Sequence, residues 1–588
     1  MKKKIILCLA LMVMILSSVN IFAEKKETRD IQILATSDLH GKFYPYDYAI
    51  NEESKSGSLT QIASAVKKYK TEDTIIVDVG DTIQDNYSEM FFKDKLHPMM
   101  LGMNEIGYDV WVIGNHEFNF GVENLKNIIK QSASKVLVGN VYNPDGKNFA
   151  EGYTIIEKDG IKIGIIGMVT PNIVKWDSIN LKDYKVTDPV EETKKLAKEL
   201  RGKVDILIAA EHMGEENEYN VLNSGVNDLA KACPELDLII AAHEHKLVEE
   251  VYVNGILIVE NKSSAATMSK VNIILEKENG KYKIVDKKAE SIKIADYESD
   301  KELAEKLAPY NKRAVDEANI IIGELTGGSL VPENEIADIP QAQLESTPLI
   351  DFINEVQMYY AGADVSSAAL FNTDANLQPG KIKKSDTALI YKYGNTLYKV
   401  EMTGKQLKKY MEWSAAYYNK YNKGDLTISF NENVRSFNYD MFSGVDYQID
   451  ISEDAGHRIK NLKWSKTGKE VKDDDKFIIA VNNYRVNTHL LAYGEIFQEG
   501  EELPKVLEID VKGNIGGVRE LIGDYIKNVK NGKIEVKNPK NWEIIGNDWD
   551  MKKHEKAVQM IKEGKIQIPK SADGRTPNVK SITENDIK

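Results

Sequence analysis

Cysteine is scarce in this sequence, whose 588 residues contain only two, Cys8 and Cys233. Cys8 lies in an apolar stretch at the N-terminus, so the remainder of the chain has one cysteine and cannot form an internal disulfide. A fold stapled by disulfides is excluded, and stability must come from the burial of apolar surface. We expect Cys233 to be a small buried apolar residue, with a reactive thiol as the less favoured alternative.

Long apolar runs are also absent beyond the first residues, so no later stretch is predicted to cross a membrane. At the start, Lys2, Lys3 and Lys4 precede an apolar run at residues 5–16 and a set of small residues up to Ala23. This pattern predicts a signal peptide over residues 1–23, and we read no lipid anchor at Cys8. The mature protein is expected to be exported, either periplasmic or extracellular, and not bound to a membrane.

An excess of positive charge is missing as well. The chain has 77 Lys and Arg against 91 Asp and Glu, a net charge of −14, and loss of the three leader lysines makes it about −17. Such an acidic protein is a poor candidate for binding polymeric nucleic acid. Apolar residues make up 42% of the chain, the proportion of an ordinary globular protein, and the length predicts at least two domains.

The first half alternates short β-rich apolar runs with helix-like segments, which predicts βαβ units and an α/β domain over residues 28–295. A charged, alanine-rich segment near residues 302–319 predicts a connector helix within a linking region at 296–330. The second half mixes strands and helices, and we expect an α+β domain over residues 331–548. Residues 549–588 are predicted to form a polar, loosely packed C-terminal appendage.

Polar residues recur where the apolar runs of the first half end. In open α/β sheets, ligands bind just beyond the carboxyl ends of the strands, so these residues are expected to gather although they lie far apart in sequence. The chain has nine histidines, and five of them occupy such positions. The set comprises Asp38, His40, Asp81, Asn115, His116, His212, His243 and His245.

Acids, an amide and imidazoles of this kind are the ligands that a pair of divalent metal ions requires. Two metal ions about 3.5–4 Å apart acidify a bridging water and clamp the charge that develops during phosphate-ester hydrolysis. Each motif alone is weak, because a lone histidine such as His212 is more often a hydrogen-bonded structural residue. Five motifs in order, each after an apolar run, favour one functional site.

At these motifs the chain resembles the calcineurin-like metallophosphoesterases that carry a 5′-nucleotidase C-terminal domain. The matching motifs are Asp38-x-His40, Gly80-Asp81, Gly114-Asn115-His116-Glu117, His212 and His243-x-His245. Within that family the chain is most similar to the bifunctional 2′,3′-cyclic-nucleotide 2′-phosphodiesterase/3′-nucleotidases. The stretches that carry this similarity include Asn482-Asn483-Tyr484-Arg485, Phe437-Asn438-Tyr439-Asp440 and Asn395-Thr396-Leu397.

The resemblance implies a four-layered catalytic domain and a role for each motif residue. One metal would be held by Asp38, His40, Asp81 and His245, and the other by Asp81, Asn115, His212 and His243. His116 would be a catalytic residue that contacts the phosphate, with Asn119 orienting it. Phe437 and Tyr484 would sandwich the base, and Arg485 would also bind substrate. Mn, Zn, Fe, Co and Ni all suit such a ligand set.

Asn119 separates the branches of the family. In relatives that act as 5′-nucleotidases an Asp at this spacing pairs with the catalytic histidine, and the cyclic-phosphodiesterase branch shows Asn instead. A neutral Asn orients the imidazole without raising its pKa through charge. A simple hydrogen-bonding Asn is the alternative interpretation.

Two departures from the family pattern bear on the pocket. Ala242 stands where the family usually has Gly, and residues 486–489 replace a small, Gly-rich loop.

The resemblance implies an exported enzyme that hydrolyses 2′,3′-cyclic nucleotides to 3′-nucleotides, and 3′-nucleotides to nucleosides and phosphate. Two alternatives stay open from the sequence. One is a 5′-nucleotidase or nucleotide-sugar hydrolase on the same scaffold. The other is a surface protein that binds nucleotides without turning them over. Nucleotides are the expected partners, and no feature of the sequence indicates an oligomeric state.

Overall fold

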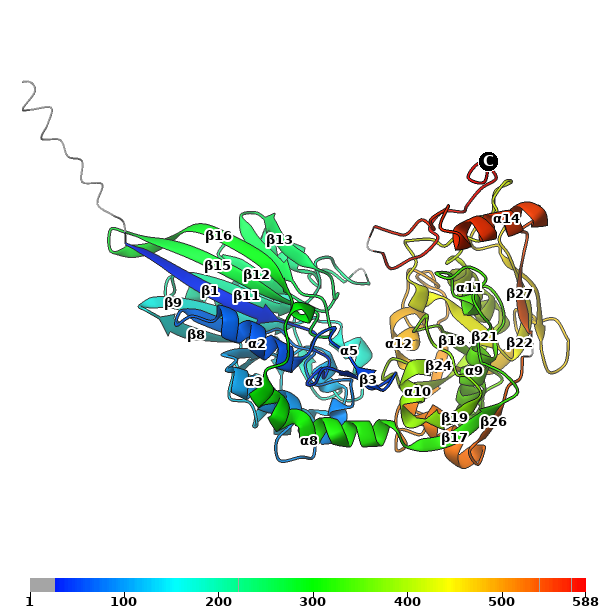
Figure 1. Cartoon of the computed structure of the whole chain (residues 1–588), viewed down its shortest axis with the longest axis horizontal. Helices are drawn as coiled ribbons and strands as arrows, with labels where there is room; N and C mark the ends of the chain where they lie inside the picture. Colours follow the sequence, from blue (N-terminus) through cyan, green and yellow to red (C-terminus); the bar gives the residue numbers. More distant parts are fainter. Residues whose placement is uncertain (1–26, 220, 539, 573) are drawn as a thin grey trace, which may run out of the picture. The chain divides into compact units, whose positions relative to one another are not determined.

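The computed structural model describes residues 27–219, 221–538, 540–572 and 574–588 (Figure 1). The predicted signal peptide lies outside these residues. The chain divides into two compact units. Unit 1 runs to Pro45 and continues with Lys55–Pro171 and Asn180–Leu307, and unit 2 comprises Tyr46–Ser54, Asn172–Ile179 and Ala308–Lys588.

Unit 1 contains two six-stranded sheets whose central strands run parallel. The first has the order β16 (Lys281–Lys293), β15 (Thr267–Glu278), β1 (Thr28–Thr36), β4 (Thr74–Asp78), β5 (Val110–Val112) and β6 (Lys135–Leu137). The second has the order β13 (Val248–Val253), β14 (Ile256–Glu260), β12 (Leu238–Ala241), β11 (Ile206–His212), β9 (Ile161–Val169) and β8 (Tyr153–Lys158). The expected α/β alternation is therefore confirmed.

The two sheets of unit 1 pack face to face. Ile33 and Val77 of the first sheet share one fully buried apolar cluster with Ile163 and Ile208 of the second. Helices α6 (Pro189–Leu200) and α7 (Val226–Ala232) bury their apolar faces on the other side of the second sheet. Helices α2 (Leu59–Tyr69) and α3 (Pro98–Ile106) lie along the first sheet (Figure 1). These are the four layers that the resemblance implied.

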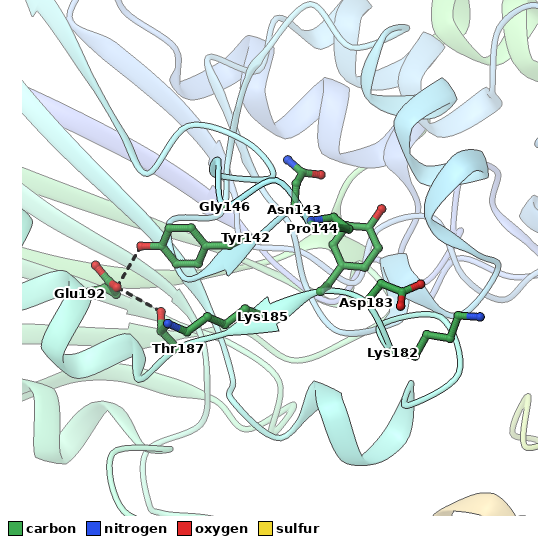
Figure 2. Close-up of a pocket in the computed structure, with 10 residues that line it drawn as sticks. Tyr142, Asn143, Pro144, Gly146, Lys182, Asp183, Lys185, Thr187 and Glu192 are labelled. Carbon is green, nitrogen blue, oxygen red and sulfur yellow. Dashed lines mark hydrogen bonds between the residues drawn. The ribbon is translucent and has the colours of Figure 1, made fainter.

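A small cavity of unit 1 lies beside the two-stranded sheet of β7 (Val141–Tyr142) and β10 (Lys185–Val186). Its volume is about 500 Å³, and its lining is polar (Figure 2). The Tyr142 and Thr187 hydroxyls both donate to Glu192 Oε1, at 2.9 and 3.2 Å. None of the ten residues that line this cavity belongs to the predicted site.

Helix α8 (Lys301–Ala318) forms where the sequence predicts the connector, and it continues through Pro309. Unit 2 is built on a five-stranded sheet of mixed direction, as expected of an α+β domain. Its order is β21 (Asp440–Ser443), β18 (Val365–Ala369), β24 (Lys476–Asn482), β20 (Leu397–Thr403) and β25 (Lys505–Glu508). Helix α9 (Pro348–Ala361) packs on this sheet, and α11 (Gly404–Ala415) begins at a capping box.

Unit 2 also contains two three-stranded sheets and two short helices. The sheets are β19 (Gly380–Lys383), β17 (Ile321–Thr326) and β26 (Lys533–Glu535), and β23 (Ile459–Trp464), β22 (Val445–Asp450) and β27 (Trp542–Ile545). The helices are α10 (Lys384–Ile390) and α13 (Val518–Asp524). Among the residues that the structure describes, no helix is both long and apolar enough to cross a membrane.

The C-terminal segment is not loosely packed, and that expectation is wrong. It contains α14 (Met551–Lys562), and Ala557 and Ile582 bury against Leu426 in a small separate core. Asn578 is fully buried, and the Phe430 and Asn578 backbones are hydrogen-bonded at 3.0 Å. A few buried apolar side chains suffice to hold a segment whose composition is mostly polar, which is why composition alone is misleading here.

Candidate metal centre

The predicted ligands lie on the loops that leave the parallel strands of unit 1. Asp38 and His40 follow β1, Asp81 follows β4, and Asn115 follows β5. On the second sheet, His212 ends β11, and His243 and His245 follow β12. Backbone hydrogen bonds join the first two loops, because Asp38 N–H donates to Gly80 O at 2.8 Å and His40 N–H to Asp81 O at 2.9 Å.

The backbone at these ligands is strained. A positive φ is uncommon for residues other than glycine, and clusters of such residues mark functional sites. Five of the seven predicted ligands have a φ between 46° and 80°. Those five are Asp38, His40, Asp81, His243 and His245.

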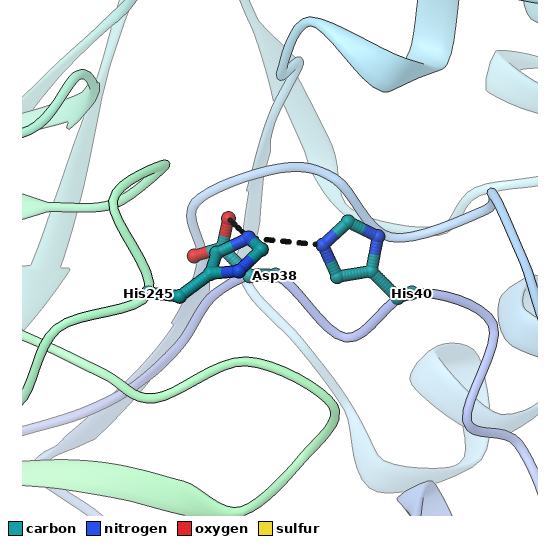
Figure 3. A group of neighbouring side chains, drawn as sticks. All are labelled: Asp38, His40 and His245. Carbon is teal, nitrogen blue, oxygen red and sulfur yellow. Dashed lines mark hydrogen bonds and ion pairs between the residues drawn. The ribbon is translucent and has the colours of Figure 1, made fainter. Parts of the chain in front are cut away.

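The side chains converge in two groups of three. Asp38, His40 and His245 form one group (Figure 3), and Asp81, His212 and His243 form the other. Within each group the potential ligand atoms lie within 4.8 Å of one another. Asn115 joins the second group, because its Oδ1 lies 3.0 Å from His212 Nε2. All seven predicted ligands thus meet at one place, although their identity as ligands stays a prediction.

Hydrogen bonds select which nitrogen of each imidazole faces the centre. His212 Nδ1 lies 2.6 Å from the carbonyl oxygen of Val79. Because a carbonyl oxygen can only accept, Nδ1 carries a proton. The other ring nitrogen, Nε2, faces Asp81 Oδ2 at 3.2 Å. His40 Nδ1 lies 3.0 Å from Gln84 Oε1, and its Nε2 lies 3.1 Å from His245 Nε2. Imidazole nitrogens and carboxylate oxygens therefore face one another within each ligand group.

Such a set of buried ligands requires positive charge. Burial opposes ionisation of Asp38, but a hydrogen bond and the nearby charge of His245 outweigh it and lower the pKa of Asp38 to about 2. Burial also opposes protonation of His212, yet Asp81 raises the pKa of His212 to about 10. Protons thus provide the positive charge that divalent cations would supply, and the N and O donors suit Mn, Zn, Fe or Co.

His116 lies beside the two groups rather than within either of them. Its backbone N–H donates to Asp81 Oδ1 at 2.8 Å, and its ring lies 5.5 Å from that of His40. Its Nδ1 lies 2.6 Å from Asn119 Oδ1, which accepts the hydrogen bond. The other ring nitrogen, Nε2, lies 3.9 Å from Asp81 Oδ2. The side chain is 32% exposed, and it is therefore accessible to a ligand.

Comparison with known proteins identifies both halves of the chain. Residues 31–247 match the family described as calcineurin-like phosphoesterase, and residues 322–491 match the 5′-nucleotidase C-terminal domain. The protein is a calcineurin-like phosphoesterase with a 5′-nucleotidase C-terminal domain. Calcineurin-like phosphoesterases use divalent metals, in agreement with the two ligand groups of unit 1.

Two curated relatives illustrate the range of this family. The chain is 28% identical to a 2′,3′-cyclic-nucleotide 2′-phosphodiesterase/3′-nucleotidase of Haemophilus influenzae, over 93% of each protein. It is also 28% identical to the trifunctional nucleotide phosphoesterase YfkN of Bacillus subtilis. That match covers 87% of this chain, but the chain spans only 39% of YfkN.

The fold of the phosphoesterase is shared with solved structures. A provisionally assigned 5′-nucleotidase from Staphylococcus aureus is 20% identical, with a TM-score of 0.73, and the match covers 88% of this chain and all of that one. At this identity the likeness establishes the two-domain fold alone.

Glu117 joins two of the loops that carry predicted ligands, a role that the sequence did not predict. It is 1% exposed, and its carboxylate accepts four backbone N–H groups. Oε2 accepts from Asp81 and Gly114 at 2.9 and 2.7 Å, and Oε1 accepts from Thr82 and Ile83 at 2.6 and 3.3 Å. One side chain thus joins the loop of Asp81 to the loop of Asn115. Its place in the Gly-Asn-His-Glu motif was the available signal.

The residues predicted to bind the nucleoside lie in unit 2. Phe437 and Tyr484 are neighbours with ring centroids 6.4 Å apart, but their planes meet at 77°. A flat base cannot lie parallel to both rings in this arrangement, so the expected sandwich would require one ring to turn. Asn483 holds the Tyr484 turn in place by exchanging hydrogen bonds of 2.9 and 3.0 Å with the backbone of Thr396.

Arg485 is placed differently from the expectation. It is fully buried, and its guanidinium donates to Asp440 Oδ2 at 2.6 Å, Asn438 Oδ1 at 2.9 Å and Phe437 O at 2.7 Å. Because buried charges require a partner, Arg485 pairs with Asp440. Its burial does not support the predicted contact with substrate. The side chain instead anchors the loop that carries Phe437 next to the turn of Tyr484.

The first prediction concerns Glu117. In Glu117→Gln one of the two acceptor oxygens becomes an amide donor, so two backbone N–H groups lose their acceptor, at about 1–3 kcal/mol for each. We expect a lower melting temperature and weaker metal binding, measured by thermal unfolding and by metal content after dialysis. Glu123→Gln, at an exposed position of the following helix, is the control. Wild-type stability and metal content in Glu117→Gln would contradict this role.

Proposed function

We propose that this protein hydrolyses 2′,3′-cyclic nucleotides to 3′-nucleotides, and 3′-nucleotides to nucleosides and phosphate. The observation that carries the proposal is the pairing of His116 with a neutral Asn119 beside two complete ligand groups. Relatives that bear the name of this activity match 80–93% of the chain at 25–28% identity and support it.

In this proposal Asp81 would help to hold both metal ions. Asp38, His40 and His245 complete one ligand set, and the other is completed by Asn115, His212 and His243. When bound, the metals would withdraw charge from the phosphoryl oxygens and acidify a water molecule. The remaining steps belong to the side chains of the protein.

His116 has the geometry of a proton donor. Because Asn119 accepts the hydrogen on Nδ1, any proton that moves during the reaction is carried by Nε2, which faces the ligand groups. In the protonated imidazole, Nε2–H can donate to a phosphoryl oxygen or to the departing ribose oxygen. Asn119 holds the ring in this orientation and adds no charge to it.

Recognition of the nucleoside is assigned to the C-terminal domain. The half-buried rings of Phe437 and Tyr484 would sandwich the base once one ring turns, and Arg485 would hold the Phe437 loop in position through Asp440. The signal peptide predicted from the sequence would make this an exported enzyme that acts on RNA breakdown products outside the cytoplasm.

A 5′-nucleotidase is the second candidate, because residues 322–491 match a domain family of that name. Substrate specificity separates the two. Purified, metal-loaded protein should release phosphate from 3′-AMP and convert 2′,3′-cyclic AMP to 3′-AMP and adenosine, with 5′-AMP the slowest substrate. Preference for 5′-AMP would overturn the proposal in favour of the second candidate. Binding of all three without turnover would identify a non-catalytic nucleotide-binding protein.

A second prediction tests His116 as a catalytic residue. His116→Ala should retain both metals and lower the turnover of 3′-AMP by about 10²–10⁴-fold, the usual contribution of a positioned acid. Metal content must be measured on the same sample. If the variant loses one metal, His116 is a ligand, and if turnover is unchanged it has no catalytic role.

A third prediction tests the two aromatic residues. Stacking of a base on an aromatic ring is worth about 1–3 kcal/mol, so Phe437→Ala or Tyr484→Ala should lower kcat/KM for 2′,3′-cyclic AMP by roughly 5- to 150-fold. A small phosphate ester without an aromatic group serves as the control substrate, and its hydrolysis should not change. Equal losses on both substrates would mean that the two residues only support the fold.

A further inference from the structure

We infer that Glu218 is a positioning residue of the metal centre, which fixes the tautomer of His243 by accepting a hydrogen bond from its outer ring nitrogen. The inference rests on the proposed metal centre and adds a residue to it. Glu218 belongs to none of the motifs found in the sequence. It lies between β11 and α7, on the segment that follows His212.

The hydrogen bond between the two side chains is bifurcated, with one imidazole nitrogen facing both carboxylate oxygens. His243 Nε2 lies 3.2 Å from both Glu218 Oε1 and Glu218 Oε2. An ionised carboxylate can only accept, so the hydrogen of a neutral imidazole must be on Nε2. The lone pair of the ring is then on Nδ1, and Nδ1 is the nitrogen that can act as a metal ligand. The His243 ring itself lies 5.4 Å from that of His212 in the second ligand group.

A similar hydrogen bond to the outer ring nitrogen is present at two other predicted ligands, where the acceptor is neutral. Val79 O accepts from His212 Nδ1, and Gln84 Oε1 accepts from His40 Nδ1. Metal-binding histidines commonly hold their second nitrogen in this way, and the acceptor orients the ring and raises its basicity. Among these three acceptors Glu218 alone bears a full negative charge, so it should strengthen its histidine as a ligand more than the others do.

The backbone around Glu218 is held by local hydrogen bonds. Glu218 N–H donates to Ser224 Oγ at 2.8 Å, and Asn217 Oδ1 accepts from the N–H groups of Ser224 and Gly225 at 2.8 and 3.0 Å. A side chain at Gly225 would meet the carbonyl carbon of Glu216 at 2.4 Å, so the close approach of these two backbone segments requires glycine there. These contacts keep the Glu218 carboxylate within reach of His243.

The test compares substitutions that keep or reverse the hydrogen bond, in the full-length protein. Glu218→Gln retains an acceptor oxygen, whereas the ammonium of Glu218→Lys can only donate and would force Nε2 to accept. Exposed Glu216 is the matched control, because Glu216→Lys makes the same change of charge in the same segment. Mn²⁺ affinity is measured by competition with a chelator, and thermal unfolding without metal verifies the fold.

We expect Glu218→Lys to weaken the binding of one of the two Mn²⁺ ions by about 10–100-fold, the usual cost of losing such an acceptor. Glu218→Gln keeps an acceptor oxygen and loses only the charge, so its loss of Mn²⁺ affinity should be clearly smaller than that of Glu218→Lys, and Glu216→Lys should have little effect. Equal losses of Mn²⁺ affinity in Glu216→Lys and Glu218→Lys would mean that the added positive charge alone causes the loss, which would overturn the inference. An equally large loss in Glu218→Gln would make Glu218 a direct ligand. Absence of Mn²⁺ binding by the wild-type protein would instead contradict the proposed function.

Discussion

Two carboxylates buried beside four imidazoles are the constraint on which the rest of unit 1 depends. Asp38 and Asp81 are at most 1% exposed, and an ionised carboxylate is stable in such surroundings only beside positive charge. Despite burial, His245 lowers the pKa of Asp38 and Asp81 raises the pKa of His212, so His212 holds a proton, whereas burial lowers the pKa of His40 to about 4. A divalent cation can replace such a proton with little rearrangement, because the hydrogen bonds at Val79 and Gln84 stay in place.

Holding these buried carboxylates and imidazoles together requires the surrounding fold. Parallel strands bring the loops to one edge of each sheet, and the positive φ values at five ligands turn their side chains toward a common point. Glu117 then joins the Asp81 loop to the Asn115 loop through four backbone amides. The site is therefore assembled from long-range contacts, and each ligand is useful only because the others are fixed.

The convergence of the seven predicted ligands could be anticipated from sequence because each one lies at the end of an apolar strand and the order of the motifs is distinctive. The four layers were implied by the family resemblance that these motifs carry, and the connector helix by its charged, alanine-rich sequence. Glu218, by contrast, reaches His243 through a loop whose shape depends on hydrogen bonds of Asn217 and Ser224, which leave no periodic pattern. Burial of Arg485 against Asp440, and packing of the C-terminal segment on Leu426, likewise depend on tertiary contacts that composition does not reveal.

Anomalous X-ray diffraction from crystals grown with Mn²⁺ would test the metal centre most directly. The account predicts two anomalous peaks about 3.5–4 Å apart, with Asp81 bridging them. One peak should be ligated by Asp38, His40 and His245, and the other by Asn115, His212 and the Nδ1 atom of His243. A single peak, or two peaks that do not share Asp81, would contradict the account.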